Sequence, residues 1–138
     1  MKRRQLLKSV PAAAFLPSAL AALPQSPGTV YELRIYHAAE GKLDALLARF
    51  RDHTVRIFEK HGIKNFAYWL PTDDPLKGHT LVYMLIHPSR EAADANWKSF
   101  REDPEWIAVK DKSEANGKLV EKVDSTFLTL TDFSPRLR

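Results

Sequence analysis

The 138-residue sequence contains no cysteine. This absence excludes disulfide bonds, thiolate catalysis, cysteine-ligated metal sites and a lipid-anchored lipobox. The sequence also lacks a phosphate-binding loop, a dinucleotide-binding glycine fingerprint, a nucleophile elbow and a His-Glu-x-x-His zinc helix. The spacing of the five histidines suggests no shared set of metal ligands. We therefore predict no catalytic residues, no metal site and no cofactor.

The sequence has little excess charge once its first ten residues are set aside. The formal net charge is +4, but Lys2, Arg3, Arg4 and Lys8 account for all of it. Without them, 17 basic residues face 17 acidic residues. A nearly neutral body argues against a broad phosphate-binding surface, so we expect no nucleic-acid partner.

The N-terminus resembles an export signal. Residues 2–8 read KRRQLLK, which is similar to a twin-arginine motif, and an apolar segment too short to span a membrane follows over 10–23. We expect a signal peptide over 1–23, with cleavage near Ala21, a linker over 24–28 and a periplasmic or secreted mature protein without a membrane span. A disordered N-terminus or a mitochondrial presequence is the alternative, since the segment is also free of acids.

Apolar periodicity and turn signals predict one domain over 29–133 and a loose tail over 134–138. We expect strands over 29–37, 63–70, 79–87 and 120–131, a helix over 41–61, and a second helix that starts after Ser89, breaks at Asp103-Pro104 and stops at Asn116-Gly117. The order β-α-β-β-α-β predicts an α+β, ferredoxin-like sandwich with strand order 4-1-3-2 and both helices on one face of the sheet.

The first strand has two different faces, with Tyr31, Leu33 and Ile35 on one and Glu32, Arg34 and Tyr36 on the other. We expect the apolar set to pack in the core and the polar set to lie on the bare face of the sheet. The strand over 79–87 is apolar on both faces, which is more than a soluble monomer usually exposes. We therefore expect a homodimer through the sheet faces, with the polar set of the first strand inside the joint barrel.

The domain resembles the NIPSNAP family over roughly 30–135. The similarity rests on Tyr31–Tyr36, Gly41–Leu43, Tyr68-Trp69, Leu81–His87, Ser89–Glu91, Trp97 and Asp103–Trp106. The resemblance implies a ferredoxin-like fold within the dimeric α+β barrel superfamily. It supplies no catalytic residues. Other branches of that superfamily include small monooxygenases, isomerases and haem proteins, so the resemblance implies a ligand pocket by analogy only.

Arg34 is the leading candidate for a ligand contact. It either forms a structural salt bridge or anchors an anion, with Tyr36 donating a hydrogen bond. Three further aromatic side chains either wall an apolar pocket or belong to the core, and His53 either reaches a cleft or is solvated. The candidate ligand-binding residues are therefore Glu32, Arg34, Tyr36, His53, Tyr68, Trp69 and Tyr83.

Three functions fit these features. The first is a dimeric small-ligand-binding or assembly module. The second is a monooxygenase or isomerase that needs little cofactor and acts on a small apolar or aromatic substrate in a pocket at the sheet. The third is a scaffold for a protein partner. The lack of an assembled acid–base or nucleophilic set favours the two functions without catalysis.

Overall fold

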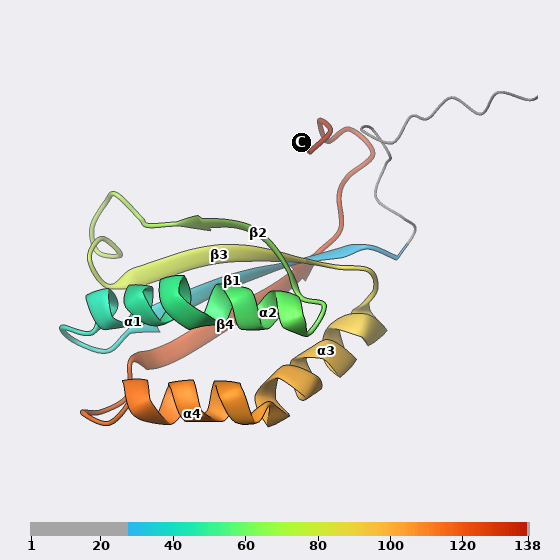
Figure 1. Ribbon diagram of the computed structural model, residues 1–138. Helices are drawn as coiled ribbons and strands as arrows, with labels where there is room; N and C mark the ends of the chain where they lie inside the picture. Colours follow the sequence, from blue (N-terminus) through green and yellow to red (C-terminus); the bar gives the residue numbers. More distant parts are fainter. Residues whose placement is uncertain (1–27, 138) are drawn as a thin grey trace, which may run out of the picture.

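The structure is a computed structural model that describes residues 28–137. The expected signal peptide and most of the expected linker lie outside these residues. The domain follows the predicted order of strands and helices (Figure 1). Its elements are β1 (Val30–Ala38), α1 (Leu43–Arg49), the π-helical turn η2 (Phe50–Thr54), α2 (Val55–Lys60), β2 (Lys64–Trp69), β3 (Thr80–His87), α3 (Arg90–Glu102), α4 (Pro104–Ser113) and β4 (Val120–Leu128).

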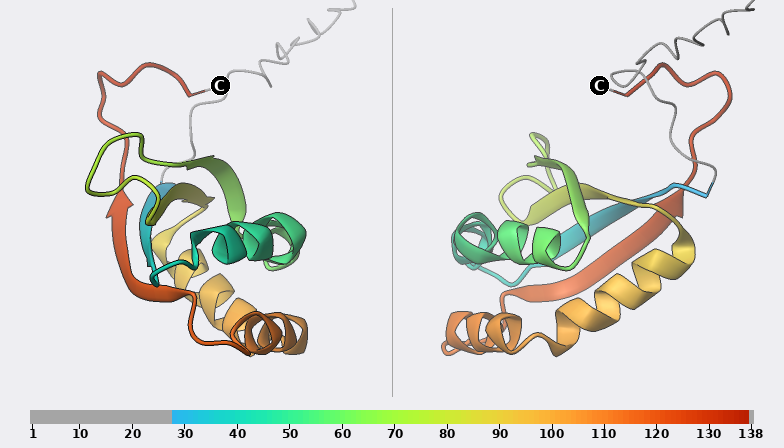
Figure 2. Two further views of the ribbon diagram at one scale, coloured as in Figure 1. Left: turned by 90° about the vertical axis from the view of Figure 1, so that its left-hand side faces the viewer. Right: turned by 45° about the vertical axis from the view of Figure 1, so that its right-hand side comes forward.

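The strands form a four-stranded antiparallel sheet in the order β2-β3-β1-β4. This is the predicted order 4-1-3-2, so the α+β fold is confirmed and β1 lies in the centre of the sheet. The helices lie together on one side of the sheet (Figure 2). Among the described residues, the opposite side of the sheet carries no helix; we call it the open face.

Side-chain caps set the ends of the two C-terminal helices. Ser89 precedes α3, and its hydroxyl accepts a hydrogen bond from the backbone N–H of Ala92 at 3.0 Å. Asp103 precedes α4, and its carboxylate accepts from the N–H of Glu105 at 2.8 Å, with Pro104 as the first helical residue. The predicted break between the two helical pieces is therefore confirmed.

The first helical region contains an irregularity that the sequence did not predict. The expected helix over 41–61 is interrupted by η2, in which each turn holds an extra residue. The hydroxyl of the buried Thr54 donates to the backbone carbonyl of Arg49 at 3.2 Å, at the start of this turn. Leu46 of α1, Phe50 at the start of η2 and Ile57 of α2 all reach the core, so the apolar stripe continues through the wider turn.

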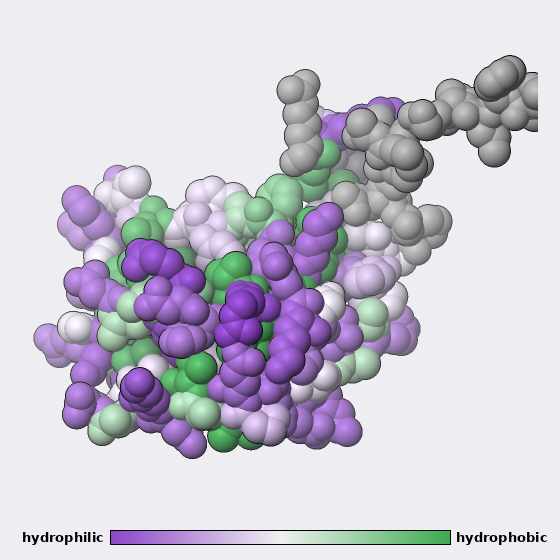
Figure 3. Space-filling model, in the orientation of Figure 1, coloured by the Kyte–Doolittle hydropathy of each residue, from purple (hydrophilic) through white to green (hydrophobic). Residues whose placement is uncertain are grey.

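The hydrophobic core lies between the helices and the sheet. The buried side chains of α1, η2 and α2 pack on those of β3 and of α3, with contributions from Leu46, Phe50, Ile57, Phe58, Leu81, Tyr83, Leu85, Trp97 and Phe100. Several of these contacts are aromatic, including an edge-to-face pair of Phe58 and Trp97 with ring centroids 5.3 Å apart. In the view of Figure 3, hydrophilic side chains cover most of the visible surface outside this core.

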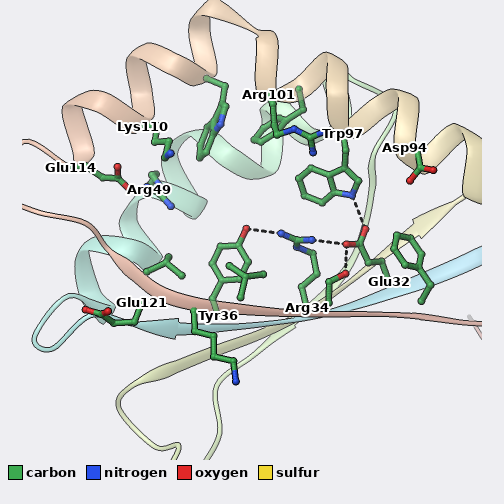
Figure 4. Close-up of a pocket in the computed structure, with 17 residues that line it drawn as sticks. Glu32, Arg34, Tyr36, Arg49, Asp94, Trp97, Arg101, Lys110, Glu114 and Glu121 are labelled. Carbon is green, nitrogen blue, oxygen red and sulfur yellow. Dashed lines mark hydrogen bonds and ion pairs between the residues drawn. The ribbon is translucent and has the colours of Figure 1, made fainter.

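The two faces of β1 are the reverse of our expectation. The polar set points under the helices, where Glu32 is only 1% exposed (Figure 4). Leu33 and Ile35 lie half-buried on the open face, and of the expected apolar set only Tyr31 is buried. The strand register places Leu33 beside Met84 and Ile35 beside Val82 on that face. The assumption that the apolar face turns toward the helices was wrong, because partners from three other elements satisfy the polar side chains beneath them.

Candidate functional site

A cavity of about 660 Å³ lies between the helix-facing side of β1 and β4 and the helices α3 and α4 (Figure 4). Four aromatic side chains contribute to its walls: Trp97, Phe100, Trp106 and Phe127. The polar side chains of β1, namely Glu32, Arg34 and Tyr36, line its floor. Its size and mixed lining are typical of a small-molecule site.

Glu32 is the centre of a buried hydrogen-bond network. Its carboxylate accepts from the Trp97 indole Nε1 at 2.7 Å, from Arg34 Nη1 at 2.6 Å and from the Ser125 hydroxyl at 2.8 Å, and it bonds His87 Nε2 at 2.9 Å. Burial opposes ionisation, but the hydrogen bonds and the Arg34 charge outweigh it and lower the pKa of Glu32 to about 2. Glu32 is therefore a firmly ionised carboxylate whose lone pairs are occupied.

Arg34 is held on several sides by its neighbours. Its Nε donates to the Tyr83 hydroxyl at 2.8 Å and its Nη2 to the Tyr36 hydroxyl at 3.2 Å, while Nη1 is bound to Glu32. The guanidinium carbon lies 4.3 Å from the Trp97 ring centroid, a cation–π contact. Burial acts to lower the pKa of Arg34, but these neighbours raise it above its usual value. The arrangement matches the structural salt bridge that was one of our two readings of this residue.

Arg49, the last residue of α1, also lines the cavity, and the sequence analysis missed it. Its side chain is buried; Nη1 donates to the Ser113 hydroxyl at 3.1 Å and lies 3.6 Å from the Glu114 carboxylate. The guanidinium carbon is 5.2 Å from the Trp106 ring centroid. Its buried Nε has no hydrogen-bond partner among the described residues. A signal was present, because Arg49 falls between Leu46 and Phe50 on the apolar stripe of its helix.

The structure does not gather the seven predicted residues into one site. Glu32, Arg34 and Tyr36 line the cavity, but Tyr83 lies fully buried beneath it. Tyr68 is half-buried and stacks on Tyr83, with ring centroids 5.0 Å apart, on the helix side of β2.

The remaining two candidates lie elsewhere. Trp69 is on the open face beside Val82 and is 46% exposed, so the three aromatic residues do not form a common pocket wall. Alternation along β2 puts its neighbour Tyr68 on the other side of the sheet. His53 is exposed and lines a second cavity of about 460 Å³ between the first helical region and α4, with Asp52 and Lys112.

The described residues hold no preassembled metal site. Across residues 28–137, no group of three or more His, Asp or Glu side chains is placed to hold a metal ion. In the same range, no helix has the length and apolar character needed to cross a membrane.

Solved structures share the fold of this chain. A NIPSNAP-like domain protein from Burkholderia xenovorans superposes with a TM-score of 0.68 at 19% identity, covering 80% of this chain and 91% of that protein. A NIPSNAP family protein from Agrobacterium tumefaciens has a TM-score of 0.67 at 24% identity, covering 78% and 97%. A second Agrobacterium tumefaciens NIPSNAP protein, described as of unknown function, gives 0.67 at 19% identity, covering 80% and 95%. At these identities the likeness shows the fold alone.

A comparison with curated proteins found no match. The NIPSNAP family profile, in contrast, matches residues 31–135, which is nearly the whole described domain. The match begins at the first residue of the Tyr31–Tyr36 stretch on which the resemblance was based. The chain therefore belongs to the NIPSNAP family.

Proposed function

We propose that this NIPSNAP protein is an exported, dimeric small-ligand-binding module whose ligand occupies the cavity between the sheet and the helices α3 and α4. The observation that carries the proposal is the cavity itself, with aromatic walls and a polar floor. The floor is held rigid by the network around Glu32, which gives a ligand a preorganised surface.

The chemistry of the floor favours binding over catalysis. A general base needs a pKa near the working pH and a free lone pair, whereas Glu32 has a pKa of about 2 and accepts hydrogen bonds on both oxygens. The Tyr83 hydroxyl is buried, and burial raises its pKa well above the usual value. These two groups are poor candidates for proton transfer in a monooxygenase or isomerase.

The open face supports the dimer part of the proposal. Half-buried apolar side chains continue across the strands of this face, with Leu33, Ile35, Val82, Met84 and Ile86 at its centre. A second copy placing the same face against it would remove these side chains from water, at about 25 cal/mol per Å² of apolar surface. This dimer differs from the one expected from the sequence, because Leu33 and Ile35 of β1 would lie in the joint and the polar set would not.

Native mass spectrometry of protein purified from the periplasm of its own cells tests the ligand part of the proposal. We expect a dimer that retains a small molecule in each subunit. In a Val123→Trp variant, the new indole would fill the cavity that Val123 lines, and we expect the molecule to be lost. Ile107→Trp is the matched control, since Ile107 is 45% exposed, close to the 42% of Val123, but does not line the cavity. Equal retention in both variants would contradict the proposal.

A further inference from the structure

The cavity contains more positive than negative charge that is available to a ligand. Its acidic side chains are already paired: Glu32 with Arg34, Asp94 with Arg90 at 3.4 Å, Glu121 with Lys118 at 3.0 Å and Glu114 with Arg49 at 3.6 Å. Among its basic side chains, Lys122 is paired with Asp124 at 3.4 Å. Lys110 and Arg101 form no ion pair with any other described residue.

Arg49 adds a buried and incompletely satisfied donor to this end of the cavity. Its contact with Glu114 is long, its Nε–H has no acceptor among the described residues, and it is only 6% exposed. Burial lowers the pKa of Arg49, which means that its present partners only partly offset the loss of water around the guanidinium. Figure 4 shows Arg49 and Lys110 at one end of the cavity, where Glu114 also lies, with Glu32 and Trp97 toward the other.

The remaining walls suit an apolar body. The helical side of the cavity is lined by Trp97, Phe100 and Trp106, and the sheet side includes Phe127. A ligand with a negative group and an apolar or aromatic skeleton would match both the basic side chains at one end and the aromatic walls. The planar fork of a guanidinium matches the two oxygens of a carboxylate.

We propose that the cavity selects small organic acids, with the carboxylate bound by Arg49 and Lys110 and the apolar skeleton packed on the aromatic wall. This inference rests on the proposed function, because it assigns a ligand class to the same cavity. It assigns ligand recognition to Arg49 rather than to Arg34, whose Nε, Nη1 and Nη2 all donate to protein groups.

The test uses the dimer emptied of any retained molecule and a panel of aryl and alkyl carboxylates with about six to twelve carbons, a size that fits such a cavity. Each carboxylate is compared with the alcohol of the same skeleton by isothermal titration calorimetry. We expect the best carboxylates to bind about tenfold or more tightly than their alcohols, with affinity that falls as salt is raised. Inorganic phosphate is included as a separate arm; binding of phosphate with no binding of the carboxylates would overturn the inference.

Substitutions then test whether binding depends on the basic side chains or only on the shape of the cavity. We expect Lys110→Gln to weaken carboxylate binding about tenfold and to leave alcohol binding unchanged. Arg49→Gln should have the larger effect, and Arg49→Lys, which keeps the charge, should recover part of it. Lys98→Gln is the control, since this exposed α3 lysine does not line the cavity. Lys110→Gln should fold like the wild type, because Lys110 is exposed and its ammonium forms no ion pair with another described residue. A loss of binding in this variant can therefore be assigned to the lost charge.

The outcomes distinguish this inference from the proposed function. If alcohols bind as tightly as carboxylates, or if Lys110→Gln changes nothing, the carboxylate assignment fails while the cavity remains a binding site. If no member of the panel binds, the carboxylate assignment also fails. The proposed function fails separately, if Val123→Trp leaves the molecule retained from cells in place.

Discussion

The two faces of the sheet differ in the side chains that they bury: polar and hydrogen-bonded under the helices, apolar on the open face. Under the helices, β1 presents a carboxylate, a guanidinium and a phenol that satisfy one another and their neighbours. On the open face, the same strand presents Leu33 and Ile35 beside the apolar side chains of β3. The comparison teaches that polarity alone does not tell which face of a strand an α+β domain buries. A buried face can be polar when its donors and acceptors are matched, and here it borders a cavity.

The largest loss of folding stability is expected when the hydrogen-bond network around Glu32, on the helix side of the sheet, is broken. Replacing Glu32 with alanine leaves the buried Arg34 charge and the Trp97 indole N–H without their acceptor. We expect the free energy of unfolding to fall by about 3–5 kcal/mol, which is typical of removing one member of a buried ion pair. Urea denaturation followed by circular dichroism measures it.

Asp124 offers the matched comparison on the other side of the sheet. It pairs with His37 at 2.9 Å, but the two side chains are 43% and 31% exposed. We expect Asp124→Asn to destabilise the protein much less than Glu32→Ala, because water screens an exposed pair. If the two variants lose the same free energy of unfolding, the buried network stabilises the protein no more than an exposed ion pair does.

The pH dependence of stability sharpens the same comparison. The folded-state pKa of Glu32 is lowered from 4.5 to about 2, so this group adds stability that is fully present above its unfolded pKa and is lost as the pH falls through the folded one. We expect Glu32 to contribute about 3 kcal/mol near neutral pH, lost between about pH 5 and pH 2. Denaturant midpoints measured across this range in the wild type and in Glu32→Gln test it. A slope that is the same in both proteins would contradict the assignment.

A charged substitution on the open face should weaken the association of two subunits and leave the folding of each subunit unchanged. Met84 lies at its centre, between Leu33 of β1 and Ala67 of β2. We expect Met84→Asp to weaken the proposed dimer about 100-fold, since a carboxylate would be buried in its apolar joint. Sedimentation equilibrium measures the change. Ile107→Asp, at an exposed apolar position on α4, is the control and should leave the dimer intact.

The smallest change in stability is expected for two neighbouring residues of β4, one on each face of the sheet. Ser125 points under the helices and donates to Glu32, whereas Thr126 lies on the open face beside Leu33. We expect Ser125→Ala to lower the free energy of unfolding by about 1.5 kcal/mol, the low end for a hydrogen bond to a charged group, because Ser125 is exposed. Thr126→Ala should have almost no effect on the unfolding of the subunit. Thermal denaturation of both variants provides the measurement.

Apolar periodicity, together with turn and cap signals, was enough to predict the fold. Ser89, Asp103-Pro104 and Gly62 mark helix ends that the structure confirms, and Gly62 has the positive φ of +76° that ends a helix in the left-handed conformation. These signals act locally, within a few residues, and so can be read from the sequence. With the apolar periodicity they ordered the elements, and the right-handed crossover rule then gave the order of the strands.

The orientation of β1 and the role of Arg49 could not be predicted in the same way. The partners of Glu32 come from β3, α3 and β4, up to 93 residues away, and their hydrogen bonds exist only once the chain is folded. Arg49 carried a local signal in its place between Leu46 and Phe50, but its partner Ser113 lies 64 residues away along the chain and is known only from the fold. Polar residues that fall inside an apolar stripe are the signal that a sequence reading should weigh more heavily.

One measurement tests directly whether the two faces have separate roles: native mass spectrometry of Met84→Asp and Val123→Trp, each purified from the same cells as the wild type. The account predicts that Met84→Asp gives monomers that still carry a small molecule, and that Val123→Trp gives empty dimers. Loss of the dimer together with loss of the molecule in either variant would contradict it, because association and ligand binding would then depend on the same surface.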